Sequence, residues 1–387
     1  MIAFLLGSAL ALQSPWPIEM AVLPCKIAGR YLSCNAKVKG QEGAPVTARI
    51  VVSLSTTRSA FKADFLEKAR AEEGRNFQLV LGGVEISPLV ARITPALESM
   101  EDVDGVLGAD AFQGLSVGFN FDTLQLAVWN PTKVANGLAS WFEVEQDKRK
   151  PEAELKQLSY TRFSEKYASV PAISVQLNKQ NVDMLISSSV GGTALATSVL
   201  DKYSPEWKDS KTFREAGVYL AANLTIGEIK IPWISLTPVE GFQIRGFESP
   251  VLGRLAMPSI PSTRYVVDFQ GRRLITEKLQ GGSLLEMSLS RTLNIPLRID
   301  NGLLKLGTIS RLSKESADQI QGAEIVYLAD YRGTDIVMIS SGRAKDWKSR
   351  MDDFTSKALK ATQIFVNEAI SRKYRAVKIS DLTGIPR

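Results

Sequence analysis

Alternating hydrophobic and polar residues dominate the chain, and the pattern recurs in two long stretches. In each stretch an apolar strand pattern runs into a loop of small residues, at IVVSLSTTRSAF (50–61) and again at MLISSSVGGTAL (184–195). A hairpin pattern with a glycine turn and a Thr-Pro end follows each loop, at 77–95 and at 223–238. Alternation with a period of two is typical of half-buried strands. The pattern therefore predicts a mainly β protein.

The parallel between the two stretches continues downstream. VDGVLGADAF (103–112) and ESPVLGRLAM (248–257) both centre on Val-Leu-Gly, and a strand, a turn and a strand follow each of them, at 116–128 and 264–276. Four blocks in the same order predict an internal duplication. The expected units are a first lobe at 20–135, a charged linker at 136–158 and a second lobe at 159–280.

A third region, residues 285–387, does not repeat the lobe. Its pattern predicts two helices, at 315–320 and 346–362, among six strands, at 293–300, 303–311, 323–329, 335–341, 363–370 and 374–380. Trp347, Met351, Phe354 and Leu359 fall at helical intervals within the second helix, which gives it one apolar stripe. This mixture of elements predicts an α+β domain.

The composition of the chain excludes several kinds of catalytic and binding site. None of the 387 residues is histidine, which removes the commonest general base and the usual imidazole metal ligand. Two cysteines are too few for a structural metal site, so we expect no metal and no cofactor. The net charge is +6, but Lys and Arg are interspersed with acids, whereas a nucleic-acid binder concentrates them on one face. Nucleic acid is therefore not the expected partner.

The N-terminus predicts export. Residues 1–12 combine an apolar run with Ala9-Leu10-Ala11, which is typical of a signal peptide and too short to span a membrane. We therefore expect a periplasmic or secreted protein without an integral membrane span, and a buried first strand is the alternative interpretation of this segment. In an oxidising compartment Cys25 and Cys34 are candidates for a disulfide, because a turn at Gly29-Arg30 would set them opposite each other across a hairpin. Two small buried residues on adjacent strands are the alternative.

The repeated unit resembles the half-barrel lobe of aspartic proteases in its retropepsin-like form, over about 20–130 and 160–278. The resemblance implies two tandem β-barrel lobes, with flap hairpins at Gly82, Gly83 and Gly227. It also implies cleft loops that contain Ser53, Ser55, Thr56, Ser187, Ser188, Ser189, Gly108 and Gly253. The third region is similar to a PDZ domain in the order of its elements. PDZ modules follow retropepsin-like domains in some bacterial proteins, which implies a bacterial source.

The catalytic residues of that family are absent from both loops. Where the family has Asp-Thr-Gly, this chain has Ser53-Leu54-Ser55 and Ser187-Ser188-Ser189. The family's chemistry needs two carboxylates that share one proton, and a serine hydroxyl does not ionise near neutral pH. Asp64 and Asp183 fall at other positions of the strand and loop. A serine nucleophile is also disfavoured, because there is no histidine and neither loop offers a Ser-x-x-Lys spacing.

The sequence thus predicts a catalytically inactive aspartic-protease-like protein. Its expected ligand is an extended polypeptide or a protein partner, held between the lobes or as an added strand in the PDZ-like groove. A lobe alone exposes a strand edge, so we expect docking on the other lobe or on a second copy in a homodimer. The main alternative is an active aspartic endopeptidase whose acids lie elsewhere in the sequence or come from a partner chain. An envelope-structural or lectin-like role is the third possibility.

Overall fold

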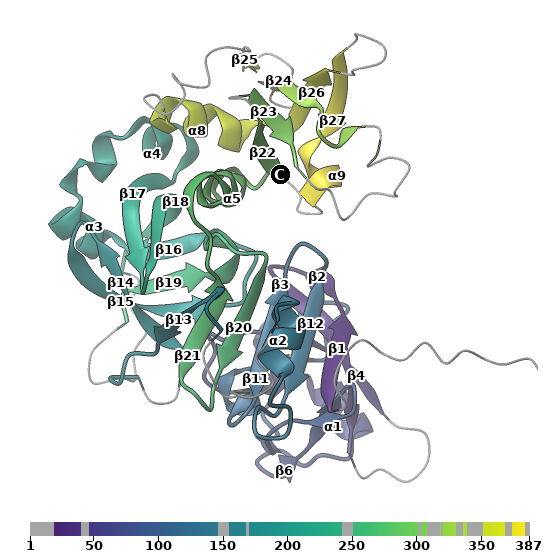
Figure 1. Ribbon diagram of the computed structural model, residues 1–387. Coiled ribbons are helices and arrows are strands. Elements are labelled where there is room, and N and C mark those ends of the chain that lie inside the picture. The colour runs from purple at the N-terminus through teal and green to yellow at the C-terminus, as the bar shows by residue number, and fades with distance from the viewer. Residues whose placement is uncertain are drawn as a thin grey trace, which may run out of the picture.

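The computed structural model describes residues 19–39, 46–145, 155–167, 170–241, 251–300, 303–307, 318, 320–329, 336–338, 351–367 and 374–383. The predicted signal peptide, the middle of the predicted linker and parts of the third region lie outside the described residues. Two β lobes and a smaller α+β domain make up the described part (Figure 1). No helix within this part is both long enough and apolar enough to cross a membrane.

The first lobe is built around two neighbouring strands, β3 (Tyr31–Val38) and β4 (Thr47–Val52). Its sheet runs β5-β10-β4-β3-β7-β8, with β2 attached to β3, and β4 is parallel to β10. The other elements are β2 (Lys26–Ala28), β5 (Ala60–Phe61), α1 (Ala63–Lys68), β6 (Asn76–Phe77), β7 (Leu79–Leu81), β8 (Val84–Glu85), β9 (Leu89–Val90), η1 (Pro95–Leu97), β10 (Gly105–Leu107) and η2 (Ala109–Phe112).

The second lobe repeats this plan with longer strands. It forms a closed barrel in the order β14-β15-β19-β16-β18-β17, and β15 is parallel to β19 as β4 is to β10. A closed barrel is found only here among the described residues, since β5 of the first lobe makes only an isolated parallel bridge, Phe61 with Ile93, where β16 pairs with β18 in the second. Its elements are β14 (Ala172–Leu177), β15 (Gln180–Ser187), β16 (Thr193–Ala196), α3 (Thr197–Tyr203), η3 (Pro205–Asp209), α4 (Lys211–Ala216), β17 (Tyr219–Ile226), β18 (Ile229–Val239), β19 (Gly253–Ala256) and η4 (Met257–Ser259).

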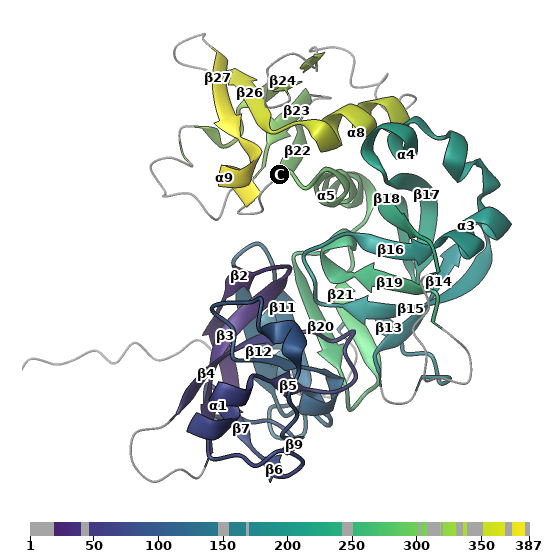
Figure 2. The ribbon, with the colours of Figure 1, turned by 180° about the vertical axis from the view of Figure 1, so that it is seen from behind.

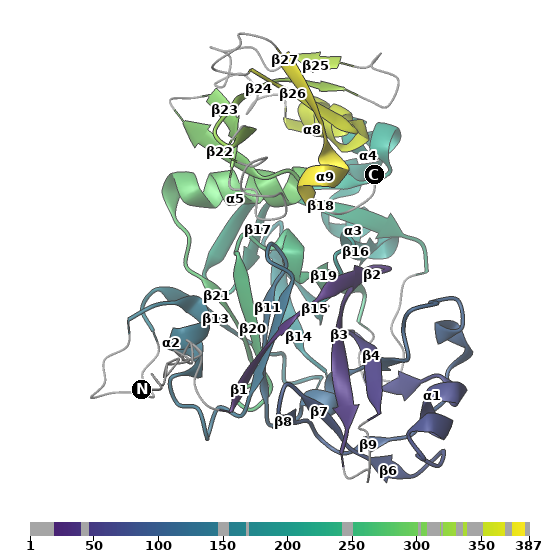
Figure 3. The ribbon, with the colours of Figure 1, turned by 90° about the vertical axis from the view of Figure 1, so that its right-hand side faces the viewer.

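A six-stranded sheet joins the two lobes (Figure 3). Its order is β1 (Met20–Pro24), β12 (Gln125–Trp129), β11 (Ser116–Asn120), β20 (Arg264–Asp268), β21 (Arg273–Glu277) and β13 (Leu158–Arg162). The lobes meet where β11 pairs antiparallel with β20, from Ser116 opposite Asp268 to Asn120 opposite Arg264. Each lobe therefore covers a strand edge of the other, so the expected docking occurs within one chain.

The predicted linker is partly structured. Residues Gly137–Phe142 form α2, whose Trp141 is 1% exposed and packs beneath the shared sheet. A Cβ on Gly118 would lie 2.7 Å from the Trp141 ring, so the glycine in β11 leaves room for that side chain. Charge and a proline suggested a solvated connection over 136–158. The aromatic residues at the start of this segment instead bind it to the core.

The third region forms one antiparallel sheet in the order β22-β23-β24-β26-β27, and β25 pairs with β24. Its elements are β22 (Leu297–Asp300), β23 (Leu303–Leu306), β24 (Glu324–Ala329), β25 (Ile336–Met338), α8 (Met351–Lys360), β26 (Gln363–Asn367), β27 (Tyr374–Lys378) and α9 (Ile379–Thr383). All six predicted strands and the longer predicted helix are present within the described residues. The Trp347, Met351 and Phe354 side chains of the predicted stripe lie outside them.

A helix that the sequence analysis did not predict connects the second lobe to the third domain. Residues Gly281–Leu293 form α5, which lies between β18 of the second lobe and the third domain (Figure 2). Leu289 and Leu293 of α5 are buried in the core of the third domain together with Ile325 and Ile364. The helix α8 packs on α4 of the second lobe, where Asp352 accepts hydrogen bonds from the backbone of Lys211 and Thr212. The third domain is therefore fixed to the second lobe.

Candidate functional site

The two small-residue loops meet at the boundary between the lobes. The Ser188 hydroxyl accepts a hydrogen bond from Leu54 N at 3.1 Å and donates one to Val52 O at 2.7 Å. Val52 and Leu54 flank Ser53, and Ser188 directly follows Ser187. The structure therefore brings together the two loops that contain Ser53 and Ser187.

Both of these serines are buried and bonded within their own loops. Ser53 is 2% exposed and its hydroxyl shares a 2.9 Å hydrogen bond with the Thr56 hydroxyl. Ser187 is fully buried and its Oγ accepts from Ser189 N at 3.2 Å. Side-chain hydroxyls that bond to nearby backbone stabilise tight turns. Their positions thus favour a structural role for the hydroxyls over a role in activating water.

In the first lobe the segment 107–109 is hydrogen-bonded to the loop that contains Ser53 and Thr56. Ser53 N donates to Leu107 O at 2.9 Å, and Ala109 N donates to Thr56 O at 2.8 Å. A Cβ on Gly108 would lie 2.7 Å from Thr56 O, so only glycine allows this close approach. Half-buried Ser55 lies in the loop that this segment supports.

The corresponding segment of the second lobe corrects the predicted alignment. Ser187 lies opposite Ala256 in the parallel pair β15–β19, and Gly253 lies opposite Leu195 as Gly105 lies opposite Phe61. Gly253 is therefore the counterpart of Gly105, not of Gly108, and it belongs to a strand rather than to a cleft loop. The shared Val-Leu-Gly letters misled the alignment, because strand pairing and not local sequence fixes the register.

A repeated hydroxyl contact supports this corrected alignment. Gly108 N donates to the Ser59 hydroxyl at 3.0 Å in the first lobe, and Ala256 N donates to the Thr193 hydroxyl at 3.1 Å in the second. Ser59 and Thr193 occupy the same place in the two small-residue stretches, 50–61 and 184–195. The predicted correspondence of those two stretches is consistent with this pairing.

The glycine turns expected to be flaps lie elsewhere. A Cβ on Gly82 would lie 2.7 Å from Ala21 Cβ in β1, and a Cβ on Gly227 would lie 2.5 Å from Thr161 Oγ1 in β13. Gly82 and Gly227 therefore lie in turns that pack on the edge strands of the shared sheet, whereas a Cβ on Gly83 would meet no described atom within 4 Å.

The carboxylates considered as alternative catalytic acids are occupied or distant from the loop tips. Asp110 accepts from Ser59 N and from the Ser59 hydroxyl, Asp183 forms an ion pair with Lys166 at 3.4 Å, and Asp64 is exposed in the first turn of α1. Within the described residues no group of three or more His, Cys, Asp or Glu is arranged to hold a metal ion.

The cysteine hairpin has the predicted register but free thiols. Ala28 lies opposite Tyr31 and Lys26 opposite Ser33, which places Cys25 opposite Cys34. The structure carries both cysteines as free thiols rather than as the predicted disulfide. The hydrogen bond with the Cys25 side chain, together with burial, raises the pKa of the Cys34 thiol well above its ordinary value. The two sulfurs are thus neighbours, and their oxidation stays a prediction.

The tip of this hairpin contacts the second lobe, which the sequence did not indicate. Val190 N donates to Arg30 O at 2.7 Å, and Tyr31 forms an antiparallel bridge with Ser189. The backbone edge of the loop at 189–190 is therefore already paired with an extended segment from the first lobe.

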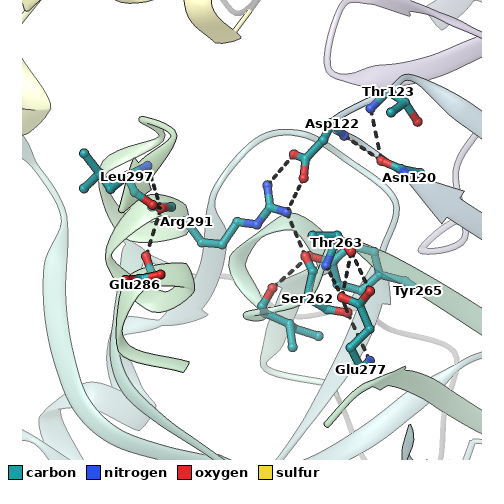
Figure 4. A network of polar contacts seen from close by, with 12 residues as sticks. Asn120, Asp122, Thr123, Ser262, Thr263, Tyr265, Glu277, Glu286, Arg291 and Leu297 are labelled. Atoms are coloured by element: carbon teal, nitrogen blue, oxygen red, sulfur yellow. Dashed lines mark hydrogen bonds and ion pairs between the residues drawn. The ribbon is translucent and has the colours of Figure 1, made fainter. Parts of the chain in front are cut away.

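A buried ion pair ties α5 to both lobes (Figure 4). Arg291 Nη1 and Nη2 lie 2.8 and 2.9 Å from the two Asp122 oxygens in the β11–β12 turn, and Nη2 also donates to Ser262 O at 2.7 Å. Burial opposes the charge of Arg291, but Tyr265 and Asp122 raise its pKa above the ordinary value, so it stays protonated. The arginine thus fixes the relative position of three parts of the chain.

A cavity of about 600 Å³ opens beside this ion pair. Val190, Gly191 and Gly192 of the second-lobe loop line it on one side, and Met287 of α5 and Leu359 of α8 line it on others. The loop tip, the helix α5 and the third domain therefore share one cavity.

No protein-family model matches the chain, and no curated protein matches it in sequence. Among solved structures it is similar to the aspartic proteinase from Irpex lacteus, with 10% identity and a TM-score of 0.44. The match covers 70% of this chain and 99% of that one.

Proposed function

We propose that this protein is an exported, non-proteolytic member of the aspartic-protease-like proteins that binds extended polypeptide. The observation that carries the proposal is the pair of buried serines, Ser53 and Ser187, at one interlobe contact. The loops keep the position that a catalytic pair would need, while each hydroxyl is bonded to its own loop. This arrangement supports a binding role rather than hydrolysis.

The chemistry argues against the alternative of an active endopeptidase. Hydrolysis by an aspartic pair needs one ionised and one protonated carboxyl group, so that a water is activated while the leaving group is protonated. Asp110 is bonded to Ser59 and Asp183 is paired with Lys166, so neither is available at Ser53 or Ser187. An acid supplied by a second copy of the chain would have to reach a contact that is already buried.

The binding role is supported by two features at the same place. The loop at 189–190 already pairs with an extended segment through the Tyr31–Ser189 bridge and the bond from Val190 to Arg30. The helix α8, which borders the proposed PDZ-like groove, contributes Leu359 to the cavity next to that loop. The bridge supports the interpretation that this loop accepts an extended segment, whereas strand addition by a further peptide needs an edge that is still unpaired.

A cleavage and binding assay on the full chain tests the proposal. Unfolded β-casein is incubated with the protein from pH 3 to pH 8 and examined by mass spectrometry, and casein binding is measured in parallel by fluorescence anisotropy. We expect binding without any new casein fragments at any pH. Fragments that appear at acid pH and disappear with pepstatin would establish the endopeptidase instead.

A further inference from the structure

Two thiols lie next to each other in the hairpin of β2 and β3. Cys25 directly precedes β2, and Cys34 lies within β3. The Cys34 side chain is 4% exposed and is hydrogen-bonded to the half-buried side chain of Cys25. The chain has no other cysteine. Any disulfide within one chain must therefore join these two residues.

The strand pairing of the hairpin suits a disulfide at this place. A two-residue turn connects the strands, and the ladder begins with Ala28 opposite Tyr31. Hydrogen-bonded and non-hydrogen-bonded pairs alternate along such a ladder, and the pair that flanks a two-residue turn is hydrogen-bonded. In the same register Cys25 and Cys34 form the fourth pair, which is of the non-hydrogen-bonded kind, and Cys25 N donates to Leu124 O instead. The Cα atoms of such a pair lie about 4.5 Å apart, within the range of disulfides.

The two thiols differ in access, which sets the order in which they react. Only a thiolate attacks a disulfide, and the attack needs room for the incoming molecule. Cys25 is half-buried between exposed Pro24 and exposed Lys26. Cys34 is enclosed in the core of the lobes, and its hydrogen bond with Cys25, together with burial, raises the pKa of its thiol. Cys25 is therefore the thiol that meets an external disulfide first, and Cys34 completes the bond.

The hairpin that carries these thiols ends in a contact with the second lobe. At its tip Arg30 O accepts a hydrogen bond from Val190 N at 2.7 Å, and Tyr31 forms a bridge with Ser189. The Arg30 side chain packs against Gly191, since a Cβ built on that glycine would lie 3.3 Å from Arg30 Cδ. A cross-link limits the conformations of the segment that it encloses. A disulfide at the base of the hairpin would thus limit the movement of the residues that make these contacts.

We propose that Cys25 and Cys34 form a thiol–disulfide exchange site, and that its oxidation strengthens the contact between the hairpin tip and the second-lobe loop. The substrate is a low-molecular-weight disulfide such as glutathione disulfide, a class of oxidant that suits an oxidising compartment. The proposal goes beyond peptide binding and does not depend on it.

The exchange takes place in two steps. The Cys25 thiolate attacks one sulfur of the small disulfide, which releases one thiolate and leaves a mixed disulfide on Cys25. The Cys34 thiolate then attacks the Cys25 sulfur and releases the second thiolate. The protein loses two electrons and two protons in total, and the small disulfide takes up both as it becomes two thiols.

Oxidation of the full chain tests the chemistry. Reduced protein is incubated with excess glutathione disulfide at pH 8, its remaining thiols are alkylated with iodoacetamide, and the product is measured by mass spectrometry. We expect an internal disulfide and no bound glutathione. Cys34→Ala should stop at the mixed disulfide on Cys25. Cys25→Ala keeps only the buried thiol and should react more slowly than Cys34→Ala by a factor on the order of ten.

Hydrogen exchange measured by NMR tests the link to the second lobe. The Val190 amide exchanges when its hydrogen bond to Arg30 O opens, and we expect exchange about tenfold slower in the oxidised protein than in the reduced protein. The Phe213 amide is the control, because its bond to the Ser210 hydroxyl lies within the second lobe and should open equally in both forms. A matched variant with alanine at both cysteine positions, treated with the same oxidant, should keep the faster exchange at Val190.

Three results would overturn the inference. If the unchanged protein keeps two free thiols or a stable glutathione adduct, the cysteines only pack together and are not an exchange site. If Cys25→Ala reacts faster than Cys34→Ala, the order of attack is wrong. If the disulfide forms and Val190 exchanges equally in both forms, the link to the second lobe fails. Thermal unfolding verifies that each variant is folded, and the measurements on the unchanged protein decide the proposal if a variant is not.

Discussion

The loops of the two lobes have the same backbone scaffold but use different side chains at the contact. In the second lobe Ser188 crosses to the first lobe, where it bonds to Leu54 N and Val52 O. The first lobe has Leu54 at the matching position, which is fully buried and has no hydroxyl to return the contact. One hydroxyl can act as donor and acceptor together, so one side chain and one backbone segment suffice to join the loops.

The segments that follow β10 and β19 and pack against the two loops also differ in their side chains. Asp110 of the first lobe accepts three hydrogen bonds from Ser59, whereas its counterpart in the second lobe is Pro258, which has no polar side chain. The first-lobe loop is thus fixed by a carboxylate and the second-lobe loop by apolar packing. The comparison teaches that the two lobes fix their loops by different means.

The largest effect is expected from placing carboxylates where the two loops meet. Ser53→Asp and Ser187→Asp each bury a carboxyl group, and together the two charges repel, so the double variant should lose more stability at pH 7 than the single variants combined. We expect a total loss on the order of 4 kcal/mol. Urea unfolding between pH 4 and pH 7 measures it.

The pH dependence of this double variant has a definite sign. The folded-state pKa values are raised, so stability is greatest below the unfolded value of about 4 and falls as the pH rises through the folded values. Strictly additive losses at pH 7 would show that the two serines are not neighbours.

The second-largest loss of stability is expected from removing the ion pair between Arg291 of α5 and Asp122 in the β11–β12 turn of the first lobe. Arg291→Met leaves Asp122 without its partner, and we expect a loss of about 3 kcal/mol, at the low end for buried pairs because the Asp122 side chain is 40% exposed. Chemical denaturation measures this loss. Arg75→Met is the control, since the Arg75 side chain is 77% exposed and its ion pair with Glu72 should contribute less than about 1 kcal/mol. Equal losses of unfolding free energy in Arg291→Met and Arg75→Met would show that the Arg291 ion pair stabilises the fold no more than an exposed pair does.

A smaller loss of stability is expected from removing single hydroxyls. It distinguishes Ser188, which bonds to the other lobe, from Ser187, which bonds within its own loop. Ser188→Ala leaves Leu54 N and Val52 O buried without a partner, which should cost about 2 kcal/mol of unfolding free energy. Ser187→Ala removes one bond within a single loop and should cost about 1 kcal/mol. If the order is reversed, the crossing contact does not hold the loops together.

The smallest effect is expected at the boundary between the second lobe and the third domain, where α8 packs on α4. Lys360 of α8 lowers the pKa of Glu215 in α4 below its ordinary value of 4.5. The ion pair therefore stabilises the folded state above pH 4.5, and this contribution is lost as the pH falls through the lowered value. Both side chains are a third or more exposed, so Glu215→Gln should cost well under about 1 kcal/mol at pH 7. An unchanged acid unfolding profile in this variant would show that the pair contributes nothing.

The sequence alone predicted the local structure well. Period-two alternation identified the strands of both lobes and of the third domain, and the Gly29-Arg30 turn predicted the register of the cysteine hairpin. The correspondence of Ser53 with Ser187 also followed from sequence. These features depend on residues close together in the chain, where side-chain alternation and turn chemistry are decisive.

Other features depend on contacts between distant residues and were missed or misplaced. Gly253 was matched to Gly108 because the letters agree, but the pairing of β15 with β19 sets a different register. The glycine turns at Gly82 and Gly227 resembled flaps until their packing on β1 and β13 was known. The helix α5 was not predicted, and its burial between two domains determines its role.

The sequence by itself determined which chemistry this protein lacks, because no folding can supply a histidine or a carboxylate at Ser53 and Ser187. Only the tertiary structure decided that the two loops meet through Ser188, that Arg291 holds three parts of the chain together and that a cavity opens beside Gly192. The reason is physical. The identity of a side chain limits its reactivity, whereas proximity across more than 100 residues results from the cooperative pairing of strands and the burial of helices.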